Sequence, residues 1–101
     1  MVQIARVSRF EGDPLRMDEG INLVSGIGLG ETSGNTGRVL LVDRSTGRAM
    51  TITFWDSEAA ASGSAGVVAP LREQIAQAFG VTAAPTVETY EVAVSDFPVN
   101  Q

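Results

Sequence analysis

The chemistry open to this 101-residue chain depends on arginine, carboxylate and hydroxyl side chains. It contains no histidine and no cysteine, and all seven of its basic residues are arginine. Nucleophilic systems built on Ser–His–Asp, Cys–His or Ser–Lys groups are therefore excluded, as are metal and haem sites that need imidazole or thiolate ligands. The acidic residues show no spacing that would make them converge, and Asp18 and Glu19 are simply adjacent on a predicted helix. No metal site is expected.

The glycine-rich stretch 25–37 (SGIGLGETSGNTG) invites comparison with a phosphate-binding loop. Such loops follow a strand and open a helix whose N-terminus holds the phosphate. Here the stretch follows a predicted helix, and no GK[ST] element is present. We interpret it as a flexible connector, with a lid over a pocket as the alternative.

Charge and hydropathy exclude several classes of partner. Twelve carboxylates against seven scattered arginines give a formal net charge of −5, so the field of the chain repels nucleic acid and anionic membranes. No apolar run approaches the roughly 20 residues that span a bilayer, and the first ten residues do not resemble a signal peptide. A cytoplasmic protein that binds neither nucleic acid nor membrane is expected.

The spacing of apolar residues predicts the elements that must position any site. Residues 2–10, 48–55 and 86–94 alternate as strands do, and the apolar run at 38–43 predicts a further strand. Helical spacing is found over 14–24 and, after a break near 63–66, over 67–79. The order β-α-β-β-α-β predicts an α+β, ferredoxin-like fold, a four-stranded antiparallel sheet with helices on one face. Residues 1–95 are expected to form this single domain, and 96–101 a C-terminal tail.

The predicted strands carry apolar residues on both faces. Met50, Ile52 and Phe54 point one way, while Thr51, Thr53 and Trp55 point the other. Because two helices can cover only one face, a monomer would expose an apolar patch. A homodimer that lays two sheets face to face is expected to bury this patch.

The segment TITFWDSEA, residues 51–59, resembles the W-[DE]-S-x-E-A signature of antibiotic biosynthesis monooxygenase-like domains, in the dimeric α/β-barrel superfamily. The hairpin LLVDRSTGRAMTITFWDSEAA and the start ARVSRFEGDPLRMDEGI are also similar to small members of that group. The resemblance covers residues 2–94 and implies the fold of a dimeric α/β barrel.

Members of this group follow two chemistries. Some oxygenate anthrone- or quinol-like aromatics with O₂ and no cofactor, and others bind and degrade haem. The haem branch needs an axial histidine, absent from residues 60–68, and an N-terminal asparagine where this chain has Ala5. The resemblance therefore implies a cofactor-independent monooxygenase-like protein acting on an aromatic or polyketide-type small molecule. A non-catalytic dimeric barrel with a binding or stress-associated role is the alternative, so enzyme activity stays open.

Cofactor-free oxygenation needs few special residues, because an electron-rich phenolate or enolate reduces O₂ itself and the protein only orients, deprotonates and desolvates it. In a pocket implied by the resemblance, Trp55 is the candidate to stack on an aromatic ring, and Arg6 or Arg38 to stabilise the anion. Hydroxyl groups that could hydrogen-bond its oxygens are those of Ser8, Thr51, Thr53 and Tyr90. Trp55 could instead only pack the core, and Tyr90 could lie at the dimer interface. No catalytic residue is assigned.

Overall fold

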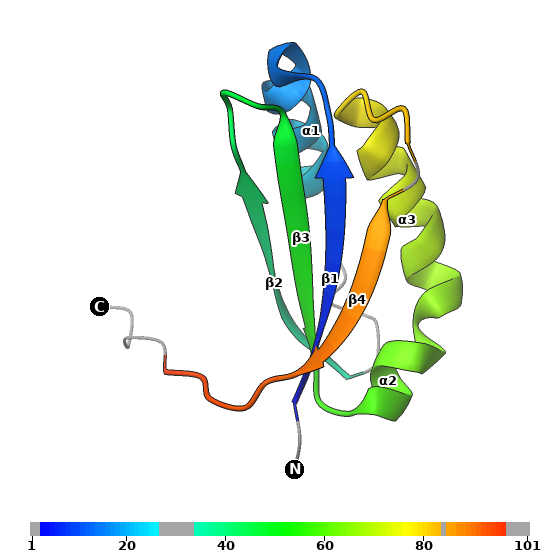
Figure 1. The fold of residues 1–101 in the computed structure, drawn as a ribbon. Coiled ribbons are helices and arrows are strands. Elements are labelled where there is room, and N and C mark those ends of the chain that lie inside the picture. The colour runs from blue at the N-terminus through cyan, green and yellow to red at the C-terminus, as the bar shows by residue number, and fades with distance from the viewer. Residues whose placement is uncertain (1–2, 27–33, 84, 97–101) are drawn as a thin grey trace.

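The protein consists of one layer of sheet packed against one layer of helices (Figure 1). The computed structural model describes residues 3–26, 34–83 and 85–96. Its elements are β1 Ile4–Glu11, the 3₁₀ turn η1 Pro14–Arg16, α1 Met17–Gly26, β2 Asn35–Val42, β3 Arg48–Trp55, α2 Glu58–Gly63, α3 Ala65–Ala78 and β4 Thr86–Glu91. The predicted β-α-β-β-α-β order is confirmed, with the second helical region divided into α2 and α3.

The sheet is antiparallel throughout, in the order β2-β3-β1-β4. The central strand β1 pairs with β3 from Ile4↔Trp55 to Glu11↔Arg48, and with β4 along its other edge. In Figure 1 the helices lie behind the sheet, and the face toward the viewer carries no helix. The ferredoxin-like fold class is therefore confirmed.

Strand β2 begins earlier than predicted. It starts at Asn35, within the stretch interpreted as a connector up to residue 37, and the ladder skips Thr36 in a bulge. The Asn35 amide closes this irregular end, because its Nδ2 donates to the carbonyl oxygens of Phe54 (3.1 Å) and Gly37 (3.3 Å). Most of the predicted connector or lid, residues 27–33, lies outside the described residues.

Strand β4 ends earlier than predicted. Its last residue is Glu91, whereas the alternation of apolar residues continues to Val94. The partner strand β1 begins at Ile4, opposite Glu91, and among the described residues one further bond follows, from Val92 N to Gln3 O (2.8 Å). Within this part of the chain, the alternation beyond Val92 has no partner strand.

Capping groups set the ends of the helices. The Asp13 side chain accepts from Leu15 N (2.9 Å) ahead of η1, and Ser57 Oγ accepts from Ala60 N (3.1 Å) at the start of α2. Ser64 forms the break between α2 and α3. Gly80 terminates α3 with a φ of 75°, a conformation that favours glycine. No helix in the described ranges is long and apolar enough to cross a membrane.

The interior between sheet and helices contains two separate apolar clusters. The larger joins Phe10, Ala49 and Phe79 with neighbours on α1 and α3, and the smaller joins Ile4, Trp55 and Ala61. Each cluster takes one residue from β1 and one from β3, at opposite ends of these central strands. The middle of the interior is therefore left to other side chains.

Candidate functional site

The middle of the sheet is polar on the face that the helices cover. On β1 the side chains on this face are Ile4, Arg6, Ser8 and Phe10, and on β3 they are Ala49, Thr51, Thr53 and Trp55. In both strands two apolar end positions enclose two polar ones. A packed core would place apolar residues at all of these positions, so the pattern indicates a site rather than a core.

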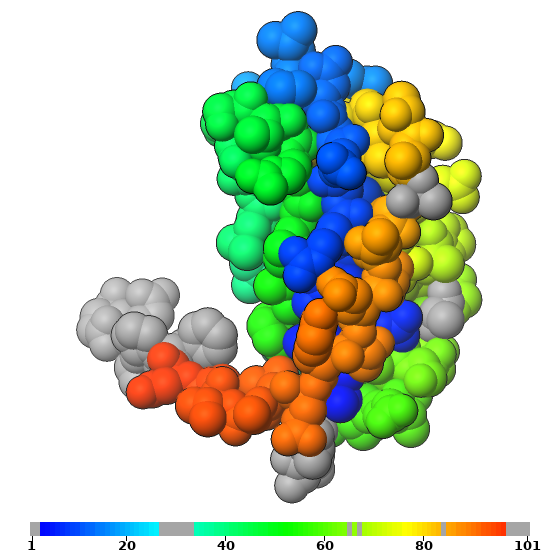
Figure 2. Space-filling view, in the orientation of Figure 1, coloured from blue at the N-terminus to red at the C-terminus, as the bar shows by residue number. Residues whose placement is uncertain are grey.

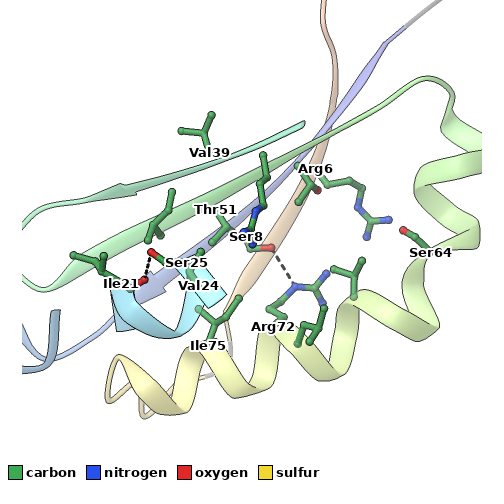
Figure 3. Close-up of a pocket in the computed structure, with 15 residues that line it drawn as sticks. Arg6, Ser8, Ile21, Val24, Ser25, Val39, Thr51, Ser64, Arg72 and Ile75 are labelled. Carbon is green, nitrogen blue, oxygen red and sulfur yellow. Dashed lines mark hydrogen bonds between the residues drawn. The ribbon is translucent and has the colours of Figure 1, made fainter. Parts of the chain in front are cut away.

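These polar residues line a cavity of about 350 Å³ between the sheet and the helices. The volume falls in the range of small-molecule sites, which combine apolar walls with a few placed polar groups. The helices supply mainly apolar side chains, and Figure 3 shows Ile21 and Val24 of α1 and Ile75 of α3 on that wall. The lining residues are Arg6, Ser8, Ile21, Val24, Ser25, Arg38, Val39, Leu40, Thr51, Thr53, Ser64, Val68, Leu71, Arg72 and Ile75.

The break between α2 and α3 helps to hold Arg6. The carbonyl oxygen of Ala61 accepts from Arg6 Nη1 (3.2 Å) and from the buried hydroxyl of Ser64 (2.7 Å). The Arg6 Nε atom is also buried, and it has no hydrogen-bond partner among the described residues. Buried donors are nearly always paired in native proteins, so this N–H in the cavity wall is a candidate donor to a ligand.

A second arginine reaches the same space from the helix layer. Arg72 of α3 donates its Nε–H to Ser8 Oγ (3.1 Å), as the dashed line in Figure 3 shows. Burial lowers the pKa of Arg72, and the nearby positive charge of Arg6 lowers it further. The Arg72 guanidinium still remains charged at neutral pH, because arginine is not deprotonated in proteins.

Five of the candidate residues from the sequence line this cavity: Arg6, Ser8, Arg38, Thr51 and Thr53. They come from three strands, and the sheet brings them together because they share one face. Whether they bind a ligand stays a prediction. Among the described residues, no carboxylate lines the cavity, and no cluster of acidic side chains could hold a metal ion.

Trp55 lies beside the cavity rather than in its wall. Its side chain is 1% exposed and packs against Ile4 and Ala61 in the smaller cluster. The indole Nε1–H donates to Thr53 Oγ1 (2.9 Å). The structure therefore gives Trp55 a packing role at the strand-to-helix junction, and it acts on the cavity by orienting the Thr53 hydroxyl.

Tyr90 lies on the opposite side of the sheet. It pairs with Ala5, whose side chain is on the helix-free face, and its hydroxyl donates to Glu88 (2.8 Å). Arg9 forms an ion pair with the same Glu88 (2.7 Å). The prediction that Tyr90 contributes to the pocket is wrong, because the register of β4 on β1 points it away from the helices. Its position fits the alternative place, on the face expected to form an interface.

Arg72 and Ser64 are lining residues that were not among the sequence candidates. The helical periodicity of the sequence does indicate Arg72. Val68, Leu71, Arg72 and Ile75 fall at i, i+3, i+4 and i+7, on one face of the helix. An arginine in an otherwise apolar stripe of a helix faces the interior. No sequence pattern indicates Ser64, since serine is common wherever a helix breaks.

No family model matches the chain. The uncharacterized proteins Rv2558 and Rv2557 of Mycobacterium tuberculosis are 36% and 33% identical over 89% and 88% of this chain. The chain spans only about two fifths of the length of these relatives, as the matches cover 39% and 40% of them.

Several solved structures have the same fold as this chain. A Streptomyces coelicolor monooxygenase from the gene ActVA-Orf6, solved with the ligand nanaomycin D, superimposes with a TM-score of 0.74 and 21% identity, over 96% of this chain and 93% of that one. A candidate antibiotic biosynthesis monooxygenase from Bordetella bronchiseptica gives 0.71 and 14%, over 89% and 96%. The chain folds as an antibiotic biosynthesis monooxygenase-like domain. The NE2512 protein of Nitrosomonas europaea, of unknown function, shares this monooxygenase-like fold with a TM-score of 0.73 and 19% identity, over 99% and 98%.

Proposed function

We propose that this monooxygenase-like domain binds an aromatic or polyketide-type small molecule in the cavity and oxygenates it with O₂, without a cofactor. The observation that carries the proposal is the polar centre of the covered sheet face, where Arg6, Ser8, Thr51 and Thr53 line an open volume instead of filling a core. Apolar side chains of α1 and α3 would contact the rings of such a ligand. The similar Streptomyces coelicolor structure contains nanaomycin D.

The reaction requires an anionic substrate. A methylene group activated by flanking aromatic rings loses a proton, the carbanion reduces O₂, and the CH₂ becomes C=O while the second oxygen atom leaves as water. Guanidinium groups would favour the ionised substrate by stabilising its negative charge. The hydroxyls of Thr51 and Thr53 would orient its oxygen atoms. The residues described in the cavity wall include no carboxylate that could act as a base, so solvent would accept the proton.

Oxygen uptake tests the proposal. We expect saturable O₂ consumption above free autoxidation with at least one member of a panel of anthrones and hydroquinones, and no product under anaerobic conditions. The Thr51→Val variant, which keeps the shape but loses the hydroxyl, should slow turnover by about tenfold or more. Arg44→Gln is the matched surface control, because Arg44 pairs with Asp18 away from the cavity. Rates equal to autoxidation across the panel would contradict an enzymatic role.

The second candidate function is a non-catalytic barrel that only binds its ligand. The cavity wall favours it in one respect, since the described lining residues offer cationic and hydroxyl groups but no general base. Saturable binding of an aromatic compound, with no O₂ consumption for that same compound, would identify this function.

We also propose that the protein is a homodimer joined through the helix-free face of the sheet, which Figure 2 shows toward the viewer. Leu41, Met50 and Arg9 form one rung of this face, and Val39, Ile52 and Val7 the next. Leu41 is 49% exposed in the single chain, and an uncovered apolar face of this kind marks an interaction surface.

The oligomeric state is tested by sedimentation equilibrium at micromolar concentration. The mass should be twice the 10.6 kDa of one chain. Leu41→Glu should give a monomer, because it places a charge in the middle of the apolar face. Leu15→Glu is the control, since Leu15 is exposed in η1 and outside the sheet. A wild-type monomer would rule out this interface.

A further inference from the structure

The seven arginines of the chain divide into two groups. Four have a carboxylate oxygen within 4 Å: the pairs are Arg9–Glu88, Arg16–Glu19, Arg44–Asp18 and Arg48–Asp43. The other three, Arg6, Arg38 and Arg72, all line the cavity. Within the described part of the chain, none of these three forms an ion pair. In a chain with a net charge of −5, the arginines that have no carboxylate partner among the described residues thus all lie around one cavity.

Two of the three cavity arginines are partly buried, so their charges destabilise the folded protein more than the charge of the exposed Arg38 does. Arg6 projects from β1 and Arg72 from α3, and Figure 3 shows both side chains reaching into the space between sheet and helix. Their protein partners are neutral, the Ala61 carbonyl for Arg6 and the Ser8 hydroxyl for Arg72. Arg6 Nε has no partner at all among the described groups. Like charges in a partly desolvated site destabilise the fold unless an anion offsets them.

The surroundings favour one kind of anion. The guanidinium fork matches a carboxylate, whose two oxygens each accept hydrogen bonds in one plane. Next to the arginines, the helix wall is apolar, with Val68, Leu71 and Ile75 on successive turns of α3. A small inorganic anion would leave this wall without contact, whereas a ring attached to a carboxylate would cover it.

We propose that the Arg6–Arg72 end of the cavity binds the carboxylate of an aromatic acid, whose ring lies against α3. This inference rests on the proposed function, which needs only an aromatic ligand, and narrows the substrate class to aromatic carboxylic acids. Arg38 lies on the edge strand β2 and is exposed, so it attracts the acid at the mouth of the cavity rather than holding it inside.

Calorimetric titration with 2-naphthoate and 2-naphthamide tests the inference, because the two probes share ring and shape and differ in charge. We expect 2-naphthoate to bind at least about tenfold more tightly, since charge-assisted hydrogen bonds are about twice as strong as neutral ones. In Arg72→Gln the difference between the probes should shrink to within about threefold. Arg44→Gln, which removes a paired surface arginine, should keep the full preference.

NMR of the arginine Nε–H groups gives a second readout that does not depend on a variant. The Nε–H of Arg6 should shift on adding 2-naphthoate, and that of Arg44 should not. Equal binding of acid and amide would overturn the carboxylate site while leaving an aromatic-binding cavity in place. Tighter binding of 2-naphthyl phosphate than of 2-naphthoate would also overturn it. Binding of neither naphthyl probe would count against both the carboxylate site and the proposed function.

Discussion

Gly20→Ala is a sharp test of the packing that holds the helix wall of the cavity. Gly20 is buried in α1, and a Cβ atom at this position would overlap the ring of Phe79, well inside the 3.0 Å that real Cβ atoms respect. Phe79 is fully buried, and its carbonyl oxygen accepts from Asp13 N (2.8 Å). The ring cannot move into solvent and its backbone is tied down, so α1 itself must shift. This shift would move Ile21, Val24 and Ser25, which follow Gly20 in α1 and line the cavity.

The expected magnitude follows from two opposing effects. Alanine is favoured over glycine in a helix by about 1 kcal/mol, while overpacking a rigid core costs about 1–3 kcal/mol and occasionally more. With the overlap falling on a buried ring, we expect the free energy of unfolding to drop by about 2 kcal/mol, equivalent to a Tm lower by about 8–16 °C for a domain of this size.

Urea denaturation followed by the fluorescence of Trp55, the single tryptophan, measures this change at a fixed protein concentration. Gly26→Ala is the matched control, because it makes the same substitution in the same helix and its Cβ would meet no described residue within 4 Å. Gly26→Ala should be neutral or up to about 1 kcal/mol more stable. A Gly20→Ala protein as stable as the wild type would show that Phe79 does not hold α1 in place.

Two further substitutions test the junction and the hairpin. Trp55→Phe should lower the free energy of unfolding by about 1–3 kcal/mol in thermal denaturation followed by circular dichroism, and should leave the affinity for 2-naphthoate within about threefold, because the ring packs the core beside the cavity. A large loss of affinity with little loss of stability would instead place the ring against the ligand. In the hairpin turn, the Ser45 hydroxyl (2.7 Å) and backbone N–H (3.0 Å) both donate to Asp43 and lower its pKa from 3.8 to about 2. Because the pKa is lower in the folded state, the carboxylate stabilises the protein above pH 3.8 and this contribution is lost as the pH falls through about 2. Urea denaturation should therefore show Asp43→Asn less stable than the wild type near neutral pH, with the gap closing between about pH 4 and pH 2; a gap independent of pH would contradict this.

Strand alternation made much of the site predictable. Arg6 and Ser8 share one parity on β1, Thr51 and Thr53 share one parity on β3, and antiparallel pairing brings them to the same face. Parity alone does not say which face a strand turns toward the helices. For β4 this depends on the register with β1, which pairs Tyr90 with Ala5, and that register is fixed by tertiary contacts rather than by any local pattern. Tyr90 was misplaced for this reason.

The local sequence predicts the structure least well where a long-range side-chain contact sets the geometry. The early start of β2 depends on the Asn35 amide bridging a bulge, which glycine content argues against. The role of Arg72 depends on how α3 packs on the sheet, which lets its guanidinium reach Ser8 of β1. Helical spacing identifies the stripe that contains Arg72, but only the packed structure shows that this stripe faces a cavity and not a filled core.

A crystal structure of the protein with 2-naphthoate would show whether the space between sheet and helices is a ligand site. We expect the naphthyl ring between β3 and α3, with its carboxylate within hydrogen-bond distance of Arg6 and Arg72 and the Arg6 Nε–H as one of the donors. A naphthoate bound only on the helix-free face of the sheet, or a cavity filled by rearranged side chains at saturating ligand, would contradict this expectation.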